Sequence, residues 1–182
     1  MNKIGFMQGR LSPLVDNQIQ AFPFDSWLDE FPLAKQLGIS CMEWTLDYPK
    51  LLQNPLLLKN YERKILNIIE EYNIEIPSVT LDCCMQRPFW KAENASELKN
   101  LINDFKLIIN AAKNIGSKIL VMPLVDNGSI ENEKEFKLLK SSLYSFYEIL
   151  IGKEIKIAFE SDYDPSKLSK FINHFEKKLF GI

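Results

Sequence analysis

The sequence predicts an α/β protein with the architecture of a partial (β/α)8 TIM barrel, about five of the eight βα units of a complete barrel. Two observations predict this fold class. Short apolar runs alternate five times with longer segments whose apolar residues recur at helical spacing. Each run also ends in polar residues, as parallel barrel strands do where they line an active site. The 182 residues are expected to form a single domain, 1–182, corresponding to the N-terminal portion of such a barrel.

The first βα unit is expected near the N-terminus. A strand is predicted over 3–8, followed by a loop and a helix that starts near Asp25 or Ser26, either of which can cap it. Gly38 is positioned to end that helix. Because proline lacks a backbone donor, we expect Pro32 to kink or restart the helix.

The other units follow the same pattern. Asn94 or Ser96 is expected to cap the third helix, Gly152 to end the fourth, and Pro77 to lie near the start of its strand. The remaining strands are predicted over 40–46, 76–81, 118–122 and 155–160, and the remaining helices over 57–72, 96–115, 136–150 and 165–175.

Two architectures fit five parallel strands. Strands that are apolar throughout and alternate with helices indicate a parallel sheet covered by helices. With five of eight strands, the barrel interior that opposing strands would pack is expected to face water. An open doubly wound sheet could use five strands, whereas a closed barrel typically needs ~250 residues. No GxGxxG motif follows the first predicted strand, and the first turn is long, so the dinucleotide-binding version of the open sheet lacks its usual signature.

Composition places the chain among soluble globular proteins, with 46% hydrophobic and 25% charged residues. A net charge of -2 does not favour a nucleic-acid partner. No apolar run approaches the ~18 residues of a membrane span. The first residues lack the apolar core and cleavage site of a signal peptide, so a cytoplasmic location is expected. The three cysteines, Cys41, Cys83 and Cys84, form no CxxC motif and are expected to be reduced and packed.

Polar residues at the predicted strand ends are the candidate functional residues. In a barrel these ends converge on one mouth, where carboxylates could hold a divalent cation or move protons. Each acid could instead be a solvated loop residue or a helix cap. Arg10 could bind a sugar hydroxyl or phosphate through its guanidinium group, or it could form a surface ion pair. The candidates are Gln8, Arg10, Glu43, Asp82, Asp126 and Glu160.

Three further side chains have two interpretations each. Trp44 and Trp90 could stack on a sugar ring near the mouth, or they could pack in the core. His174 is the only histidine and lies on the last predicted helix, away from any strand end. It is expected to be an ordinary surface residue, which leaves a Ser/His/Asp or Cys/His catalytic group without a base.

Four runs of the sequence, at 4–13, 43–44, 121–127 and 158–162, carry a family resemblance. In them the chain resembles the sugar phosphate isomerase/epimerase group of the xylose isomerase-like TIM barrels. The resemblance implies a divalent metal at the barrel mouth, commonly manganese, zinc, cobalt or magnesium. It implies that Glu160 is the first metal ligand and a catalytic base for isomerisation or epimerisation next to a carbonyl, through an enediolate-like state. The other strand-end residues would bind the sugar or sugar phosphate.

One departure from the family shapes the expected function. The remaining metal ligands of the family, an Asp, a His and an acidic or amide group, come from later strands, and His174 does not match the family histidine. The sequence ends where a sixth strand should begin, so we expect an incomplete metal site and an inactive fragment. The alternative is a non-catalytic truncated paralogue that binds a sugar or a partner subunit, since open sheet edges favour association with another chain. A DNA-repair endonuclease on the same barrel is disfavoured by the single histidine and the lack of a basic stripe.

Overall fold

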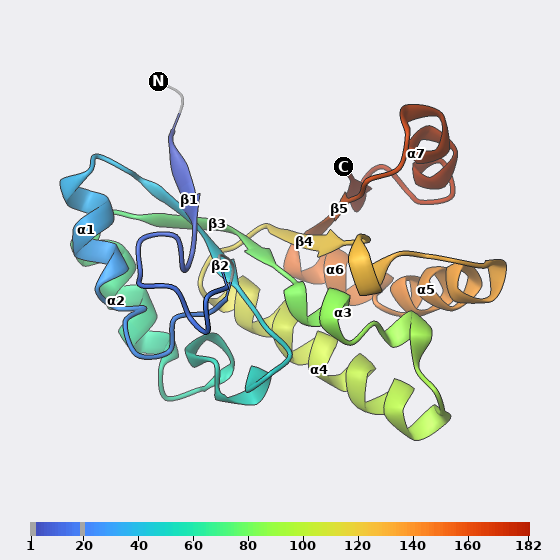
Figure 1. Cartoon of the computed structure of the whole chain (residues 1–182), viewed down its shortest axis with the longest axis horizontal. Helices are drawn as coiled ribbons and strands as arrows, with labels where there is room; N and C mark the ends of the chain where they lie inside the picture. The colour runs from blue at the N-terminus through green and yellow to red at the C-terminus, as the bar shows by residue number, and fades with distance from the viewer. Residues whose placement is uncertain (1–2, 19–20) are drawn as a thin grey trace.

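A single parallel sheet organises the chain. The computed structural model describes residues 3–18 and 21–182. Six strands follow one another in chain order across the sheet, each parallel to the next (Figure 1). The strands are β1 (Gly5–Met7), β2 (Cys41–Thr45), β3 (Glu75–Thr80), β4 (Ile119–Pro123), β5 (Lys156–Glu160) and β6 (Phe180–Gly181). In the described part of the chain β1 and β6 do not pair, so the sheet is not closed. The predicted α/β class of a partial barrel is confirmed.

Helices connect the strands, as parallel pairing requires. Figure 1 shows α2, α4 and α6 lying along one side of the sheet. Four 3-10 turns complete the connections: η1 (Leu51–Gln53), η2 (Pro55–Leu57), η3 (Phe89–Lys91) and η4 (Asp126–Gly128). The helices are α1 (Glu30–Gln36), α2 (Glu62–Tyr72), α3 (Asp82–Gln86), α4 (Ala95–Asn114), α5 (Glu133–Ser145), α6 (Tyr147–Lys153) and α7 (Pro165–Ile172). In residues 3–18 and 21–182 no helix is long and apolar enough to cross a membrane.

The two faces of the sheet differ in burial. In β2, Met42 and Trp44 are fully buried, whereas Cys41 and Glu43, which alternate with them along the strand, are half-buried. In β5, Phe159 is buried and Glu160 is exposed. The expected parallel sheet covered by helices is present on one face, and the other face is the open interior expected of a barrel with missing strands. Helices cover one face, and the described residues supply no opposing strands to cover the other, so polar side chains occur there.

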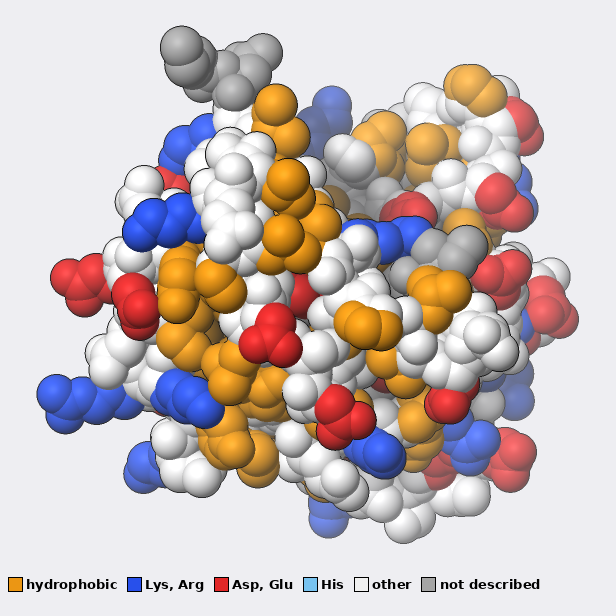
Figure 2. All heavy atoms as spheres, turned by 60° about the vertical axis from the view of Figure 1, so that its left-hand side comes forward, with side chains coloured by type: hydrophobic (Ala, Val, Ile, Leu, Met, Phe, Trp, Pro, Cys, Tyr) orange, Lys and Arg blue, Asp and Glu red, His pale blue; other side chains and the backbone are white. Residues whose placement is uncertain are grey.

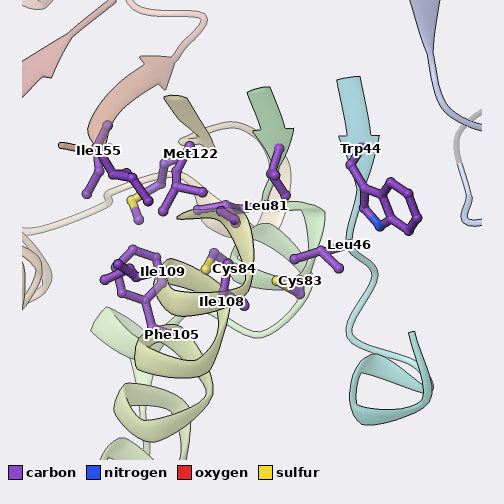
Figure 3. Packing of buried hydrophobic residues seen from close by; sticks show 14 of the residues in the cluster. Trp44, Leu46, Leu81, Cys83, Cys84, Phe105, Ile108, Ile109, Met122 and Ile155 are labelled. Carbon is purple, nitrogen blue, oxygen red and sulfur yellow. The ribbon is translucent and has the colours of Figure 1, made fainter. Parts of the chain in front are cut away.

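The main core lies between the sheet and the helices. Figure 3 shows Leu81, Met122 and Ile155, at the strands, meeting Phe105 and Ile108 of α4. All five side chains are buried, and α4 buries one side chain per turn, which matches the predicted spacing. Close packing of this layer fixes the strands to the helices and thereby positions the strand ends.

Both candidate stacking tryptophans belong to the core. Trp44 has 0% of its surface exposed, and its Nε1 donates to Asn54 Oδ1 over 3.0 Å. Trp90 has 1% exposed and packs edge-on against Phe89, with ring centroids 5.0 Å apart. Their apolar area stabilises the fold, and neither ring is available to stack on a sugar.

The first helix differs from its prediction. It begins at Glu30 rather than near Asp25 or Ser26, and turns precede it. Pro32 falls in its first turn, where the backbone N–H has no partner within the helix. The expectation that Pro32 kinks or restarts the helix is therefore wrong.

The fourth predicted helix is divided. The structure has α5 and α6, which meet at Phe146, and Gly152 lies inside α6 instead of ending it. Glu154 ends α6 in the left-handed conformation, with φ at 57°. The short α3 was not predicted, because five residues are too short to show a period. The strand β6 lies where a sixth strand was expected to begin.

The side-chain caps of two helices, α4 and α7, were predicted more accurately than the helix boundaries described above. Asn94 Oδ1 accepts from the Glu97 N–H over 3.0 Å at the start of α4. Asp164 Oδ1 accepts from the N–H groups of Ser166 and Lys167 at the start of α7, where Pro165 takes the first position. All three cysteines are free thiols, as expected.

Candidate active site at the strand ends

Three predicted residues line one pocket at the carboxyl ends of the strands. The pocket has a volume of about 280 Å³. Glu160 ends β5, Asp126 follows β4, and Asp82 follows β3, so three consecutive strands contribute one acid each. The convergence expected of parallel strand ends therefore holds for these acids. The other lining residues are Met85, Gln86, Pro123 and Val125.

Glu160 is placed by the pairing of β4 with β5. It lies opposite Pro123 in the register, and its carbonyl oxygen accepts from the Leu124 N–H over 2.8 Å. These contacts fix the end of β5 against the loop that leaves β4. The Glu160 side chain itself is exposed, so it can reach solvent or a ligand in the pocket.

Asp126 occupies the tight turn that the sequence Asp-Asn-Gly-Ser indicated. Its φ is 48°, and the Gly128 N–H donates to the Val125 carbonyl over 2.8 Å. Gly128 is needed here because a Cβ at this position would lie 2.7 Å from the Pro123 carbonyl oxygen. The turn keeps the exposed Asp126 at the rim of the pocket.

Asp82 and Gln86 form the other wall of the pocket on the short helix α3. Asp82 is the first residue of α3 and has 2% of its surface exposed. Gln86 Nε2 donates to Asp47 Oδ1 over 2.8 Å, and Gln86 Oε1 accepts from the Tyr48 N–H over 2.7 Å. Gln86 thus ties α3 to the loop after β2. It was missed in the sequence because α3 shows no period.

Glu43 lies in the middle of β2 on the less covered face. Ser78 Oγ of β3 donates to Glu43 Oε2 over 2.6 Å. Burial raises the pKa of Glu43, the hydrogen bond from Ser78 lowers it, and the negative charge of Glu160 raises it again. Glu43 therefore interacts with the pocket through Glu160, although it does not line the pocket. Ser78 was missed as a partner; its position opposite Glu43 in the strand pairing is the signal that could have found it.

Gln8 lies outside the pocket lining, inside the sheet. Gln8 is fully buried, its Oε1 accepts from the Thr45 N–H over 3.3 Å, and its carbonyl oxygen accepts from Thr45 Oγ1 over 3.2 Å. The side chain thus extends the pairing between β1 and β2 beyond the end of β1. The structure gives Gln8 a role in joining these two strands.

Arg10 also lies outside the pocket lining, on an exposed loop. The buried Glu30 of α1 holds this loop, because its Oε1 accepts from the N–H groups of Gly9 and Leu11 over 2.9 and 3.1 Å. Burial raises the pKa of Glu30, whereas the backbone hydrogen bonds lower it. The two hydrogen bonds to Glu30 fix the backbone on both sides of Arg10. This role of Glu30 was not predicted from the sequence.

The pocket offers oxygen ligands, which suit magnesium or manganese. However, the described residues contain no group of three or more His, Cys, Asp and Glu side chains arranged to hold a metal ion. The donor chemistry thus fits a hard divalent cation, but the number of convergent donors does not. Glu160 and its neighbours do not form a complete metal site on their own.

The charges on the surface are mixed. Figure 2 shows lysine and arginine side chains interspersed with acids and with exposed apolar side chains on the face it displays. This face carries no continuous basic area of the kind that follows a nucleic-acid backbone. This face gives the endonuclease hypothesis no support.

Comparison with known proteins identifies the fold. No family model matches the sequence, and no curated protein matches it. A xylose isomerase-like TIM barrel protein from Mycobacterium smegmatis, solved with magnesium, matches with a TM-score of 0.65 and 11% identity over 98% of this chain and 62% of its own. A 3-keto-D-glucoside 4-epimerase from E. coli matches with a TM-score of 0.65 and 16% identity over 98% of this chain and 67% of its own.

A D-psicose 3-epimerase, solved in the presence of D-fructose, matches with a TM-score of 0.70 and 7% identity over 97% of this chain and 61% of its own. The chain therefore has the fold of the xylose isomerase-like TIM barrels, as the resemblance implied. It spans 61% to 67% of the length of these three structures. At such low identity the likeness concerns the fold, so the activity is argued from the site.

Proposed function

We propose that the pocket of Asp82, Asp126 and Glu160 binds a sugar or sugar phosphate and belongs to an isomerase or epimerase that moves a proton next to a carbonyl. The observation that carries this proposal is the placement of Glu160 at the end of β5, in one pocket with two other acids and in electrostatic contact with Glu43. Two of the similar structures are sugar epimerases, which supports the class of substrate.

The proposed chemistry needs one group that removes a proton from the carbon next to the substrate carbonyl. It needs a second group that limits the negative charge that develops when the proton leaves. Glu160 is exposed in the pocket and would accept the proton from the carbon next to the substrate carbonyl. Glu43 does not line the pocket, but its pKa is raised by burial and by the Glu160 charge, so it would stay protonated to a higher pH than an ordinary glutamate and limit the negative charge beside Glu160. Asp82 and Asp126 would bind sugar hydroxyls, and Arg10 would bind a phosphate if the substrate carries one.

A divalent cation is part of the proposal, with Glu160 as one ligand; when bound, it would polarise the substrate oxygens. The similar structure from Mycobacterium smegmatis was solved with magnesium, which supports a divalent cation as the metal. Because the described residues lack a full ligand set, the proton transfer above is assigned to protein carboxylates alone.

Association with a second chain is also proposed. β1 and β6 each have one neighbour in the described sheet, so each presents an edge with unpaired backbone groups. Light scattering coupled to size exclusion would show a mass above 21.1 kDa if these edges mediate association. A cytoplasmic location, expected from the sequence, stays a prediction.

Deuterium exchange tests the proposed reaction directly. The protein would be incubated in D2O with Mn²⁺ and D-fructose, D-psicose or D-tagatose, and the proton next to the carbonyl followed by NMR. Exchange by the wild type, lost in Glu160→Gln and kept in the surface control Glu70→Gln, supports the proposal. Absence of both exchange and sugar binding would refute it.

The second candidate is a non-catalytic sugar-binding protein of the same fold. The lack of a metal-ligand cluster among the residues described favours it. It predicts sugar binding without deuterium exchange, and no stoichiometric metal by elemental analysis. One metal ion per chain, lost in Glu160→Gln, would exclude it.

A further inference from the structure

A second hollow lies near the loops that carry the pocket of Asp82, Asp126 and Glu160, which is called the mouth pocket below. Its volume is about 360 Å³, and it separates the start of α5 from one side of α7. The two helices lie at the same end of the molecule (Figure 1). We call it the α5–α7 groove. It shares no lining residue with the mouth pocket, but Ile130 and Tyr163 lie four and three residues after Asp126 and Glu160.

The floor of the groove is aromatic. Phe136 of α5 packs edge-on against Phe171 and His174, with centroid distances of 5.8 and 5.0 Å. Tyr163 packs edge-on against Phe171 at 5.9 Å, and the Ile130 backbone hydrogen-bonds to Tyr163. Phe136 and Tyr163 are half-buried, and Lys167 Nζ lies over the Tyr163 ring. Phe136 and the part of the Tyr163 ring that Lys167 leaves open therefore offer surface that a planar ligand could cover.

One wall of the groove is basic. Lys167, Lys170 and His174 recur at helical spacing on and just after α7, and all three are exposed. Lys167 Nζ lies 3.5 Å from the centroid of the Tyr163 ring. In the described part of the chain neither Lys170 nor His174 forms an ion pair. These two side chains can therefore turn to an anion in the groove.

The acids of the opposite wall already have partners. Glu131 forms an ion pair with Lys91 at 2.8 Å, and Glu133 forms one with Lys137 at 2.8 Å. Glu135 accepts from the Glu131 N–H and from Asn132 Nδ2. The pairing reduces the repulsion that these acids would exert on an anionic ligand.

The remaining charges orient the ligand. Burial raises the pKa of Tyr163, and the charges of Asp162 and Glu135 raise it further, so both acids lie near the Tyr163 end of the groove. An anionic group is therefore favoured at the opposite end, beside Lys170 and His174. The planar part of the same ligand would then lie toward Tyr163.

We propose that the α5–α7 groove is a binding site for an organic anion that carries a planar aromatic ring, the chemical class of a mononucleotide. The anionic group would contact Lys170 and His174, and the ring would cover Phe136 and Tyr163. A hollow of this size is at the lower end of the range for small-molecule sites, which is roughly 300–1,000 Å³. Because the same two loops continue to Asp126 and Glu160, an occupant would also contact the segments that shape the mouth.

Adenosine 5′-monophosphate is the probe for this site, with adenosine and inorganic phosphate as the two halves of the ligand. Isothermal titration of the full chain should show saturable binding of one AMP, tighter than either half. Because a hydrogen bond to a charged group contributes about 1.5–3 kcal/mol, Lys170→Gln should weaken AMP binding by about tenfold or more. The control Lys177→Gln, on an exposed lysine outside the groove, should leave it unchanged.

Amide shifts in a ¹⁵N spectrum locate the bound AMP. Shifts within 130–136 and 163–174 that persist in Glu160→Gln support the site independently of the proposed sugar chemistry. The proposal is overturned if AMP does not saturate, if phosphate alone binds as tightly, if Lys177→Gln weakens binding as much as Lys170→Gln, or if the shifts map to the mouth pocket.

Discussion

The charge of Glu160 at the end of β5 acts on Glu43 in the middle of β2 across the less covered face of the sheet, although β3 and β4 lie between their strands. Burial raises the pKa of Glu43, the Ser78 hydroxyl lowers it, and the Glu160 charge raises it again. This contact joins a residue inside the sheet to the rim of the pocket.

The first prediction concerns this contact. Replacing Glu160 by Gln removes a negative charge near Glu43, so the ionised form of Glu43 becomes more favourable and its pKa falls. Carboxyl ¹³C shifts followed through a pH titration would measure the change. Glu70→Gln, on the exposed side of α2, should leave the Glu43 pKa unchanged. An identical Glu43 titration in both variants would contradict the contact.

The second prediction concerns the pH dependence of stability. A carboxyl whose folded pKa is raised binds more protons in the folded than in the unfolded state, so stability falls as pH rises from the ordinary value of 4.5 through the folded pKa. Glu30 acts in the same direction, whereas the lowered pKa values of Glu97, Glu133 and Glu154 act below 4.5.

Glu43→Gln should therefore increase the free energy of unfolding more at pH 8 than at pH 5, because the variant lacks the penalty of ionising this carboxyl. Urea unfolding at the two pH values measures the difference, with Glu70→Gln as the control. A gain that is equal at both pH values would argue against a raised Glu43 pKa.

The third prediction concerns the hydrogen bond that anchors Trp44. Asn54 has 1% of its surface exposed, and its Oδ1 accepts from both Trp44 Nε1 and the Leu56 N–H over 3.0 Å. Asn54→Ala would leave the indole N–H buried without a partner, so we expect a loss of about 2 kcal/mol in the free energy of unfolding. Urea unfolding measures this loss. In a Trp44→Phe background the loss should be smaller, and a full loss there would show that the indole N–H does not need Asn54.

The fourth prediction concerns the loop that carries Arg10. Gly9 has φ at 93°, and a Cβ at this position would lie 2.5 Å from the Ala21 carbonyl oxygen. Gly9→Ala should destabilise the fold by more than the ~1–2 kcal/mol that the left-handed conformation costs, because the backbone must also move. Gly38→Ala is the matched control, since Gly38 has φ at 72° with nothing within 4 Å. If thermal or urea unfolding shows the same loss of stability for Gly9→Ala and Gly38→Ala, the backbone moves away from the added Cβ at no cost, which would contradict this prediction.

Much of the fold could be predicted from the sequence, because its elements are long enough to show a period. The apolar stripe of α4, its cap at Asn94 and the strand that ends at Glu160 are readable directly. The positions that failed depend on tertiary contacts. Pro32 does not disturb α1 because the helix starts at Glu30, which places the proline in its first turn. The break at Phe146 leaves the apolar spacing of 136–150 almost unchanged, so the spacing does not reveal it.

The candidate site could also be predicted in part from the sequence. Parallel strand ends must meet at one edge, and this rule alone brings Asp82, Asp126 and Glu160 together. The rule could not show that Gln8 is used within the sheet, because that depends on the position of Thr45. Nor could it show that Glu30, far along the chain, holds the loop of Arg10.

The most direct test of the account is a ¹⁵N titration of the full chain with D-fructose, D-psicose and D-tagatose. If the pocket at the ends of β3, β4 and β5 binds a sugar, at least one ketose should shift the amides of 82–86, 123–126 and 160, and Glu160→Gln should abolish these shifts while Glu70→Gln retains them. No shift at these amides with any of the three sugars, or shifts that survive Glu160→Gln, would contradict the assignment of this pocket as the functional site.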